Sequence, residues 1–315
     1  MIEAHELSKR FGGRTAVDGV SLEVARGEIV GFLGPNGAGK TTTLRILAGV
    51  FPPTAGRALV DGHDLATAPL AARARLGYAP ERPALYLEMT VAGQLEFVAA
   101  MRGASRAAAR RAAAAAAIAR TGLDDVRERR LGTLSRGLRQ RVGIALALVG
   151  DPPALLLDEP AAGLDPAQSA ELRRLVRALG RDHAVFVSSH VLADMEALCD
   201  RVVILHRGRV LAADTPAAIA ARLRPSDRVE VEVQAAGAAL DAALAAVPGV
   251  RAVHRVHEGA GRARCRVEAM PGTDVRPALA AAVAAHGWGL LALAPIEPTL
   301  EEAFLALTGV PERAA

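Results

Sequence analysis

The 315-residue chain has only two cysteines, Cys199 and Cys265, and neither belongs to a CxxC pair. So few cysteines exclude a disulfide framework and are typical of a protein in a reducing cytosol. No stretch approaches the roughly 18 consecutive strongly apolar residues that a membrane span needs. The first residues, MIEAHELSKRF, lack the apolar core of a signal peptide. The sequence therefore predicts a soluble, cytosolic protein.

The chain also lacks a strong net charge of either sign. It has 38 Lys and Arg residues and 34 Asp and Glu residues, which gives a net charge of +4. This mild excess gives no reason to expect a nucleic-acid partner. Internal repeats, heptads and zinc-ligand spacings are also missing. At roughly 150 residues per domain, the length suggests about two domains.

The first part of the chain alternates short apolar strands with helices, which predicts a mostly parallel sheet covered by helices. Between about 87 and 150 the pattern becomes helical. The Ala- and Arg-rich segment 104–120 favours a helix by propensity, with flexible low-complexity sequence as the alternative. We expect an α/β domain over 1–222 with a helical subdomain at about 87–150. Its expected strands are 28–33, 57–60, 76–79, 154–157, 184–187 and 201–205, and 41–50 is expected to be a helix.

The pattern changes after residues 223–227, which are interpreted as a linker. Residues 228–234 alternate strictly between apolar and polar side chains, as in a half-buried strand. The elements that follow give the order βαββαβ, which predicts a small ferredoxin-like α+β domain over 227–315. A last helix at 299–307 has one apolar face. This domain carries no chemical motif, and we expect it to be an accessory domain.

The strongest chemical signal is the sequence GPNGAGKT, which matches GxxxxGK[ST] between a predicted strand and a predicted helix. Its glycines let backbone N–H groups close around phosphate oxygens, and the helix N-terminus attracts the same anion. In such a loop Lys40 reaches the β- and γ-phosphates, and the Thr41 hydroxyl ligates Mg²⁺. The expected nucleotide-binding residues here are Gly34, Pro35, Asn36, Gly37, Ala38, Gly39, Lys40, Thr41 and Thr42.

A second signal is the apolar strand Leu155–Leu157 followed by Asp158 and Glu159. A carboxylate at the end of such a strand can hold Mg²⁺ beside the phosphate loop, at the carboxyl edge of a parallel sheet. We expect Asp158 to bind the metal ion. We expect Glu159 to accept a proton from the attacking water.

Three further segments follow in a fixed order around these residues: LSRGLRQR at 134–141, AGLD at 162–165 and VSSH at 187–190. Over about residues 1–220, the whole set resembles the ATP-binding subunit of ABC transporters. In that family the elements are the Walker A loop, the signature motif, the Walker B strand, the D-loop and the H-loop. The resemblance implies a P-loop NTPase fold of the ABC ATPase type.

The resemblance also implies roles for single residues. His190 would sense the γ-phosphate, and Ser135 and Gly137 would approach the γ-phosphate of ATP held by a second subunit. Phe11 matches the aromatic residue that stacks on adenine, an interaction any purine can make; a partly buried aromatic at a strand end is the alternative. Glu81 lies where many relatives carry the Q-loop glutamine.

Two segments depart from the family pattern. The signature contains Arg136 in place of a glycine and Leu138 in place of a glutamine. Arg136 could add a charge near the phosphate or crowd its approach. Glu81 keeps a side-chain oxygen for Mg²⁺ or water but adds a negative charge.

Within the family, the chain is most similar to exporters of the ABC-2 type, which include drug, polysaccharide and gliding-associated systems. The signature form, the segment SSHVLADMEALCDR and the appended C-terminal domain ending in PTLEEAF carry this similarity.

The resemblance implies an ATPase motor subunit with ATP and Mg²⁺ as cofactors. Two ATP molecules would be sandwiched in a homodimer, or in a heterodimer with a related ATPase. The dimer would drive a separate transmembrane permease from the cytoplasmic side of the membrane. Residues 82–90 and the helical subdomain would transmit the movement of the dimer to that permease. Two alternatives remain at this point: a catalytically weak regulatory subunit paired with another ATPase, and a soluble ABC ATPase outside transport.

Overall fold

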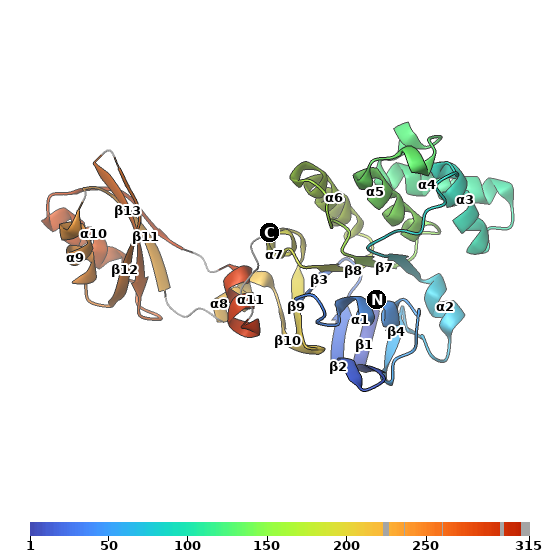
Figure 1. The fold of residues 1–315 in the computed structure, drawn as a ribbon, viewed down its shortest axis with the longest axis horizontal. Helices are drawn as coiled ribbons and strands as arrows, with labels where there is room; N and C mark the ends of the chain where they lie inside the picture. Colours follow the sequence, from blue (N-terminus) through green and yellow to red (C-terminus); the bar gives the residue numbers. More distant parts are fainter. Residues whose placement is uncertain (223–226, 236, 260, 297–298, 310–315) are drawn as a thin grey trace. The chain divides into compact units, whose positions relative to one another are not determined.

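The computed structural model describes residues 1–222, 227–235, 237–259, 261–296 and 299–309. The chain divides into two compact units, Met1–Pro216 and Ala217–Ala315 (Figure 1). The first unit ends at Pro216, the first residue of helix α8 (Pro216–Arg222), whereas the sequence analysis placed the end of the first domain at residue 222 and the start of the second at 227. Apart from Asp227, the predicted linker lies outside the described residues.

A six-stranded sheet forms the centre of the first unit, in the order β10-β9-β3-β8-β7-β6. Only the pairing of β10 with β9 is antiparallel. Strands β3, β7 and β8 are buried at every residue, as expected of parallel strands covered on both faces. The strands are β3 (Ile29–Leu33), β6 (Leu76–Ala79), β7 (Ala154–Asp158), β8 (Ala184–Ser189), β9 (Arg201–His206) and β10 (Arg209–Asp214). The predicted parallel strands of this sheet are confirmed.

A second, antiparallel sheet has the order β2-β1-β4-β5, and it corrects the sequence analysis. Its strands are β1 (Ile2–Phe11), β2 (Arg14–Val24), β4 (Ala55–Val60) and β5 (His63–Asp64). Strand β4 was assigned to the parallel sheet, which is wrong, because it pairs antiparallel with β1. Strands β1 and β2 were missed. Register shifts interrupt their pairing, and such bulges break the period-two pattern by which strands are recognised.

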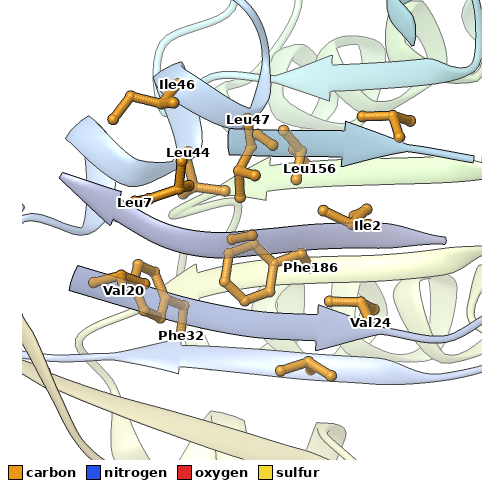
Figure 2. Close-up of a cluster of buried hydrophobic side chains, with 14 of the residues drawn as sticks. Ile2, Leu7, Val20, Val24, Phe32, Leu44, Ile46, Leu47, Leu156 and Phe186 are labelled. Atoms are coloured by element: carbon orange, nitrogen blue, oxygen red, sulfur yellow. The ribbon is translucent and has the colours of Figure 1, made fainter. Parts of the chain in front are cut away.

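The main core of the first unit lies between the two sheets and helix α1 (Lys40–Leu47). Figure 2 shows that apolar side chains from β1, β2, β3, α1, β7 and β8 meet there. Phe32 and Phe186 are fully buried, with ring centroids 5.0 Å apart. This packing fixes the β1–β2 hairpin beside the loop between β3 and α1. Gly208 connects the hairpin to this loop, because its carbonyl accepts from Asp18 N–H of β2 at 2.8 Å and its N–H donates to the Ala38 carbonyl of the loop at 2.9 Å.

Helices α3 (Val91–Met101), α4 (Ala107–Thr121) and α5 (Arg136–Leu148) form the helical part of the first unit. The helix predicted at 104–120 is therefore confirmed as α4. Helix α5 packs closely on β6, since a Cβ added at Gly77 would overlap the Ala147 carbonyl oxygen. Helices α2 (Pro69–Ala74), α6 (Pro166–Leu179) and α7 (Leu192–Leu198), with 3₁₀ turns at Asp124–Val126 and Leu131–Thr133, complete the unit.

The second unit contains the antiparallel sheet β12-β13-β11-β14. Its strands are β11 (Asp227–Gln234), β12 (Val250–Gly259), β13 (Arg262–Ala269) and β14 (Gly289–Pro295). Its helices are α9 (Ala238–Ala245), α10 (Arg276–Ala285) and α11 (Leu300–Thr308), together with α8 from Ala217 onward. The predicted order βαββαβ is therefore present. Buried side chains of β11, β13, α9 and α10 form a separate core. Within the described residues, no helix has both the length and the hydropathy to cross a membrane.

Candidate nucleotide-binding and catalytic site

The loop between β3 and α1 needs glycine at defined positions. Gly37 and Gly39 have φ angles of 79° and 111°, which residues with a Cβ rarely adopt. A Cβ added at Gly39 would lie 2.5 Å from the Ala16 carbonyl oxygen, and one at Gly34 would overlap the Leu205 carbonyl oxygen. Helix α1 begins directly after this loop, with no acidic residue in its first turn and no side-chain cap. Its N-terminus is therefore suited to an anion.

The loop forms one wall of a cavity of about 650 Å³. Most of the expected binding residues line this cavity, while Gly34, Ala38 and Asp158 are buried behind its wall. The structure also places Arg14, Ala16 and Ala162 on its surface. The full lining comprises Phe11, Arg14, Ala16, Pro35, Asn36, Gly37, Gly39, Lys40, Thr41, Thr42, Glu81, Glu159, Ala162 and His190.

Lys40 provides a nearly buried positive charge at the base of the cavity. Its Nζ atom donates a hydrogen bond of 2.6 Å to the Gly34 carbonyl and lies 3.6 Å from Glu159 Oε1. Burial lowers the pKa of Lys40, and the neighbouring Glu159 carboxylate opposes this shift. A bound anion such as a phosphate group would stabilise the charged form of the Lys40 ammonium further.

Asp158 and Thr41 offer oxygen atoms to a metal ion. Asp158 is 2% exposed, and its Oδ1 accepts a hydrogen bond of 2.7 Å from Ser188 Oγ. The Thr41 hydroxyl lies 3.5 Å from the same oxygen. Burial raises the pKa of the Asp158 carboxyl, whereas the Ser188 hydrogen bond acts in the opposite direction. Carboxylate and hydroxyl oxygens are the ligand types that Mg²⁺ prefers, so this donor set fits that ion.

Glu159 is held in a fixed position next to the cavity. Its backbone has a φ of 48°, which is uncommon for a residue with a side chain. Its N–H donates to Ser188 Oγ at 3.0 Å, and its Oε2 lies 2.7 Å from His190 Nδ1. The Glu159 carboxylate therefore lies between the Lys40 ammonium and the His190 ring. Ser188 positions both acidic residues, a role that the sequence analysis did not assign.

Phe11 ends strand β1 at the mouth of the cavity, with half of its surface exposed. Its ring meets the edge of Phe51 with centroids 5.7 Å apart, and Lys9 Nζ lies 5.3 Å from each ring. An aromatic ring held in this way can receive a planar base.

Ser135, Arg136 and Gly137 do not line this cavity. Ser135 is the N-cap of α5 and accepts a hydrogen bond of 3.3 Å from Leu138 N–H. The Arg136 guanidinium turns toward the 162–163 loop, where Nη2 donates to the Ala162 carbonyl at 2.8 Å. In this structure Arg136 therefore binds the D-loop segment of its own chain.

Glu81 lies in the cavity wall, but its main chain is held by α5. Gln140 Nε2 donates to the Glu81 carbonyl at 3.0 Å. A Cβ added at Gly143 would lie 2.5 Å from Pro83 Cγ, so α5 and this segment are closely packed. Glu81 therefore lies where the nucleotide site meets the helical part of the unit.

The sequence analysis missed Arg14 as a site residue, although one signal was present. A Gly-Gly pair at residues 12–13 is typical of a two-residue hairpin turn, even though bulges obscure the strand pattern of the segments on either side. Such a turn places Arg14 opposite Phe11, which is the pairing observed. No sequence pattern identified Ala16 or placed Ala162 in the cavity wall, because both reach it through tertiary packing.

The fold and site define a P-loop ATPase, and comparison with known proteins gives its family. The family described as "ABC transporter" matches residues 17–162. The linearmycin resistance ATP-binding protein LnrL of Bacillus subtilis (strain 168) is 32% identical over 310 residues, covering 98% of each chain. The daunorubicin resistance ATP-binding protein DrrA3 of Streptomyces coeruleorubidus is 37% identical, covering 96% of this chain and 93% of its own length. The chain belongs to the ABC transporter family, as the sequence predicted.

Solved structures agree with this assignment. An ATP-binding subunit of an ABC transporter matches with a TM-score of 0.63 and 33% identity, covering 70% of this chain and 92% of its own. A dimeric ATP-binding cassette in a post-hydrolysis state, bound to ADP and phosphate, matches with a TM-score of 0.62 and 25% identity, covering 68% and 98%. The protein is accordingly the ATP-hydrolysing subunit of an ABC transporter.

Proposed function

We propose that this subunit powers export from the cytoplasmic face of a membrane, with Lys40, Asp158, Glu159 and His190 as its ATP-hydrolysing residues. The observation that carries the proposal is the convergence of these four side chains on the phosphate loop. The direction of transport is supported by relatives named for linearmycin and daunorubicin resistance.

Each side chain has a distinct task in the proposed reaction. Lys40 and the N-terminus of α1 bind the phosphates. Thr41 and Asp158 would hold Mg²⁺, which supplies charge neutralisation at the phosphate oxygens. Glu159 orients the attacking water and accepts its proton, and His190 holds the γ-phosphate. Because Ser188 binds both Asp158 and the Glu159 backbone, it fixes the distance between the metal site and the base.

The signature residues complete the site of a second copy. Ser135 caps the N-terminus of the 13-residue helix α5, and neither Ser135 nor Gly137 lines the chain's own nucleotide cavity. A helix N-terminus presented across a two-fold interface would therefore reach the partner's γ-phosphate. This arrangement gives two ATP molecules and two composite sites per dimer.

The dimer can be tested by measuring the solution mass of the Glu159→Gln variant with and without ATP and Mg²⁺. We expect a shift from monomer to dimer, since ATP persists when the base is absent. Adding Ser135→Arg, which introduces a bulky charge at the interface, is expected to prevent the shift without preventing ATP binding. ATP binding with no shift in Glu159→Gln would instead favour a regulatory subunit that needs another ATPase.

The permease contact is proposed to lie on an apolar surface formed by Tyr86, Leu87, Phe97 and Met101. All four side chains are substantially exposed, and the Tyr86 and Phe97 rings pack edge to face with centroids 5.8 Å apart. Exposed apolar clusters of this kind mark interaction sites. The segment is anchored to α3 through Gln94, which accepts from Tyr86 N–H and donates to the Ala84 carbonyl.

The substitution Met101→Glu tests this surface, because Met101 is 73% exposed at the end of α3. We expect at least about a tenfold loss of chain recovered with its permease, since a charge must be desolvated at the contact. ATP turnover of the isolated chain is expected to stay unchanged. Leu70→Glu is the matched control, because Leu70 is 81% exposed on α2. If Met101→Glu is recovered with the permease as well as Leu70→Glu is, the permease contact lies outside the surface formed by Tyr86, Leu87, Phe97 and Met101.

A further inference from the structure

Arg14 lines the nucleotide cavity but has no role in the reaction proposed above. It begins strand β2 and pairs in register with Phe11, the last residue of β1. Both side chains line the cavity. The hairpin therefore presents an aromatic ring and a guanidinium group side by side to one ligand.

The Arg14 guanidinium also lies close to the phosphate loop. A Cβ added at Gly37 would be 3.9 Å from Arg14 Nη2. Arg14 thus lies between the ring expected to receive the base and the loop expected to hold the β-phosphate. In a nucleotide, the ribose and the α-phosphate lie between those two groups.

Charge in the cavity points to the same ligand. Its other charged side chains are Lys40, Glu81 and Glu159, which leave an excess of negative charge if Arg14 is omitted. No carboxylate among the described residues is paired with Arg14, whereas the nearby Arg10 donates its Nε to Thr15 Oγ1 at 3.3 Å. A polyphosphate is the partner that a free guanidinium in this position would bind strongly.

We propose that Arg14 is a nucleotide-binding residue that contacts the α-phosphate from the open side of the phosphate loop. The inference rests on the proposed function of this cavity as the ATP site. Since ATP and ADP share the α-phosphate, Arg14 strengthens the binding of both equally. It does not touch the γ-phosphate, the metal ligands or Glu159, so it leaves the chemical step unchanged.

The test is equilibrium binding of ADP to the full chain and its Arg14→Ala variant, at several salt concentrations. Loss of one charge-assisted contact is expected to weaken ADP about tenfold and to flatten the dependence of affinity on salt. The KM for ATP is expected to rise by the same factor at unchanged kcat. Arg14→Lys should recover part of the affinity, because it keeps the charge but not the planar fork.

Arg10→Ala is the matched control, because it removes an arginine from the same hairpin that does not line the cavity. It is expected to leave ADP affinity and its salt dependence as in the wild type. ADP affinity unchanged in Arg14→Ala, or a loss with the salt dependence unaltered, would overturn the assignment. A wild-type chain that binds no ADP would instead overturn the proposed function of the cavity.

Discussion

Replacing Glu159 with Gln is expected to lower ATP turnover by about 10²- to 10⁴-fold, the range for removal of a positioned general base. The amide has the shape of the carboxylate and can keep a hydrogen bond to His190, but it cannot accept a proton from water. The affinity for ATP is expected to stay within about twofold, since Lys40 and the phosphate loop are untouched. Phosphate release at saturating ATP, with nucleotide binding measured in parallel, gives both numbers.

Glu128→Gln is the control for this substitution. Glu128 forms an ion pair with Arg127 on the surface, with 3.2 Å between the charged atoms, and does not line the nucleotide cavity. Its replacement is expected to leave turnover unchanged. Turnover at the wild-type rate in Glu159→Gln would remove Glu159 as the base and leave His190 as the next residue to examine.

Replacing Lys40 with Ala is expected to weaken ATP binding by about 100-fold, which corresponds to the upper range for hydrogen bonds to charged groups. The ammonium is the buried cation of the cavity base, and its removal leaves Glu159 facing the phosphates without compensation. Fluorescence titration with a labelled ATP analogue measures the loss directly.

The folded state of Lys40→Ala needs a separate check. Burial already lowers the pKa of Lys40, so the charged side chain is costly in the unliganded protein. We therefore expect the thermal midpoint to change little, while the stabilisation that ATP gives the wild type is lost. A thermal midpoint of the unliganded variant far below that of the wild type would show that Lys40 contributes to folding. A variant whose midpoint ATP raises as much as that of the wild type would show that Lys40 does not contact the phosphates.

The nucleotide site could be predicted largely because its signals are local. The strand β3, the glycine loop and helix α1 follow one another without interruption, and each has its own pattern of apolar residues or glycines. Asp158 likewise ends a fully buried strand, which its run of leucines predicts from the sequence. The carboxyl ends of neighbouring parallel strands then bring the two segments together.

The rest of the site depends on contacts between distant segments. Arg14 and Ala16 reach the cavity only because β1 and β2 form an antiparallel hairpin beside the phosphate loop. Bulges hid those strands from pattern analysis. The direction of the Arg136 side chain could not be read from the signature either, because its partner, the Ala162 carbonyl, lies on a different element.

In evolutionary terms, Arg136 and Gly163 constrain one another. The Arg136 guanidinium occupies the space that a Cβ at residue 163 would need, and Gly163 has a φ of 68°. A side chain at 163 therefore carries two costs while Arg136 is present, and only the backbone strain once Arg136 is shortened. We therefore expect substitutions at the two positions to be epistatic, because shortening residue 136 removes the need to displace its guanidinium from the Ala162 carbonyl.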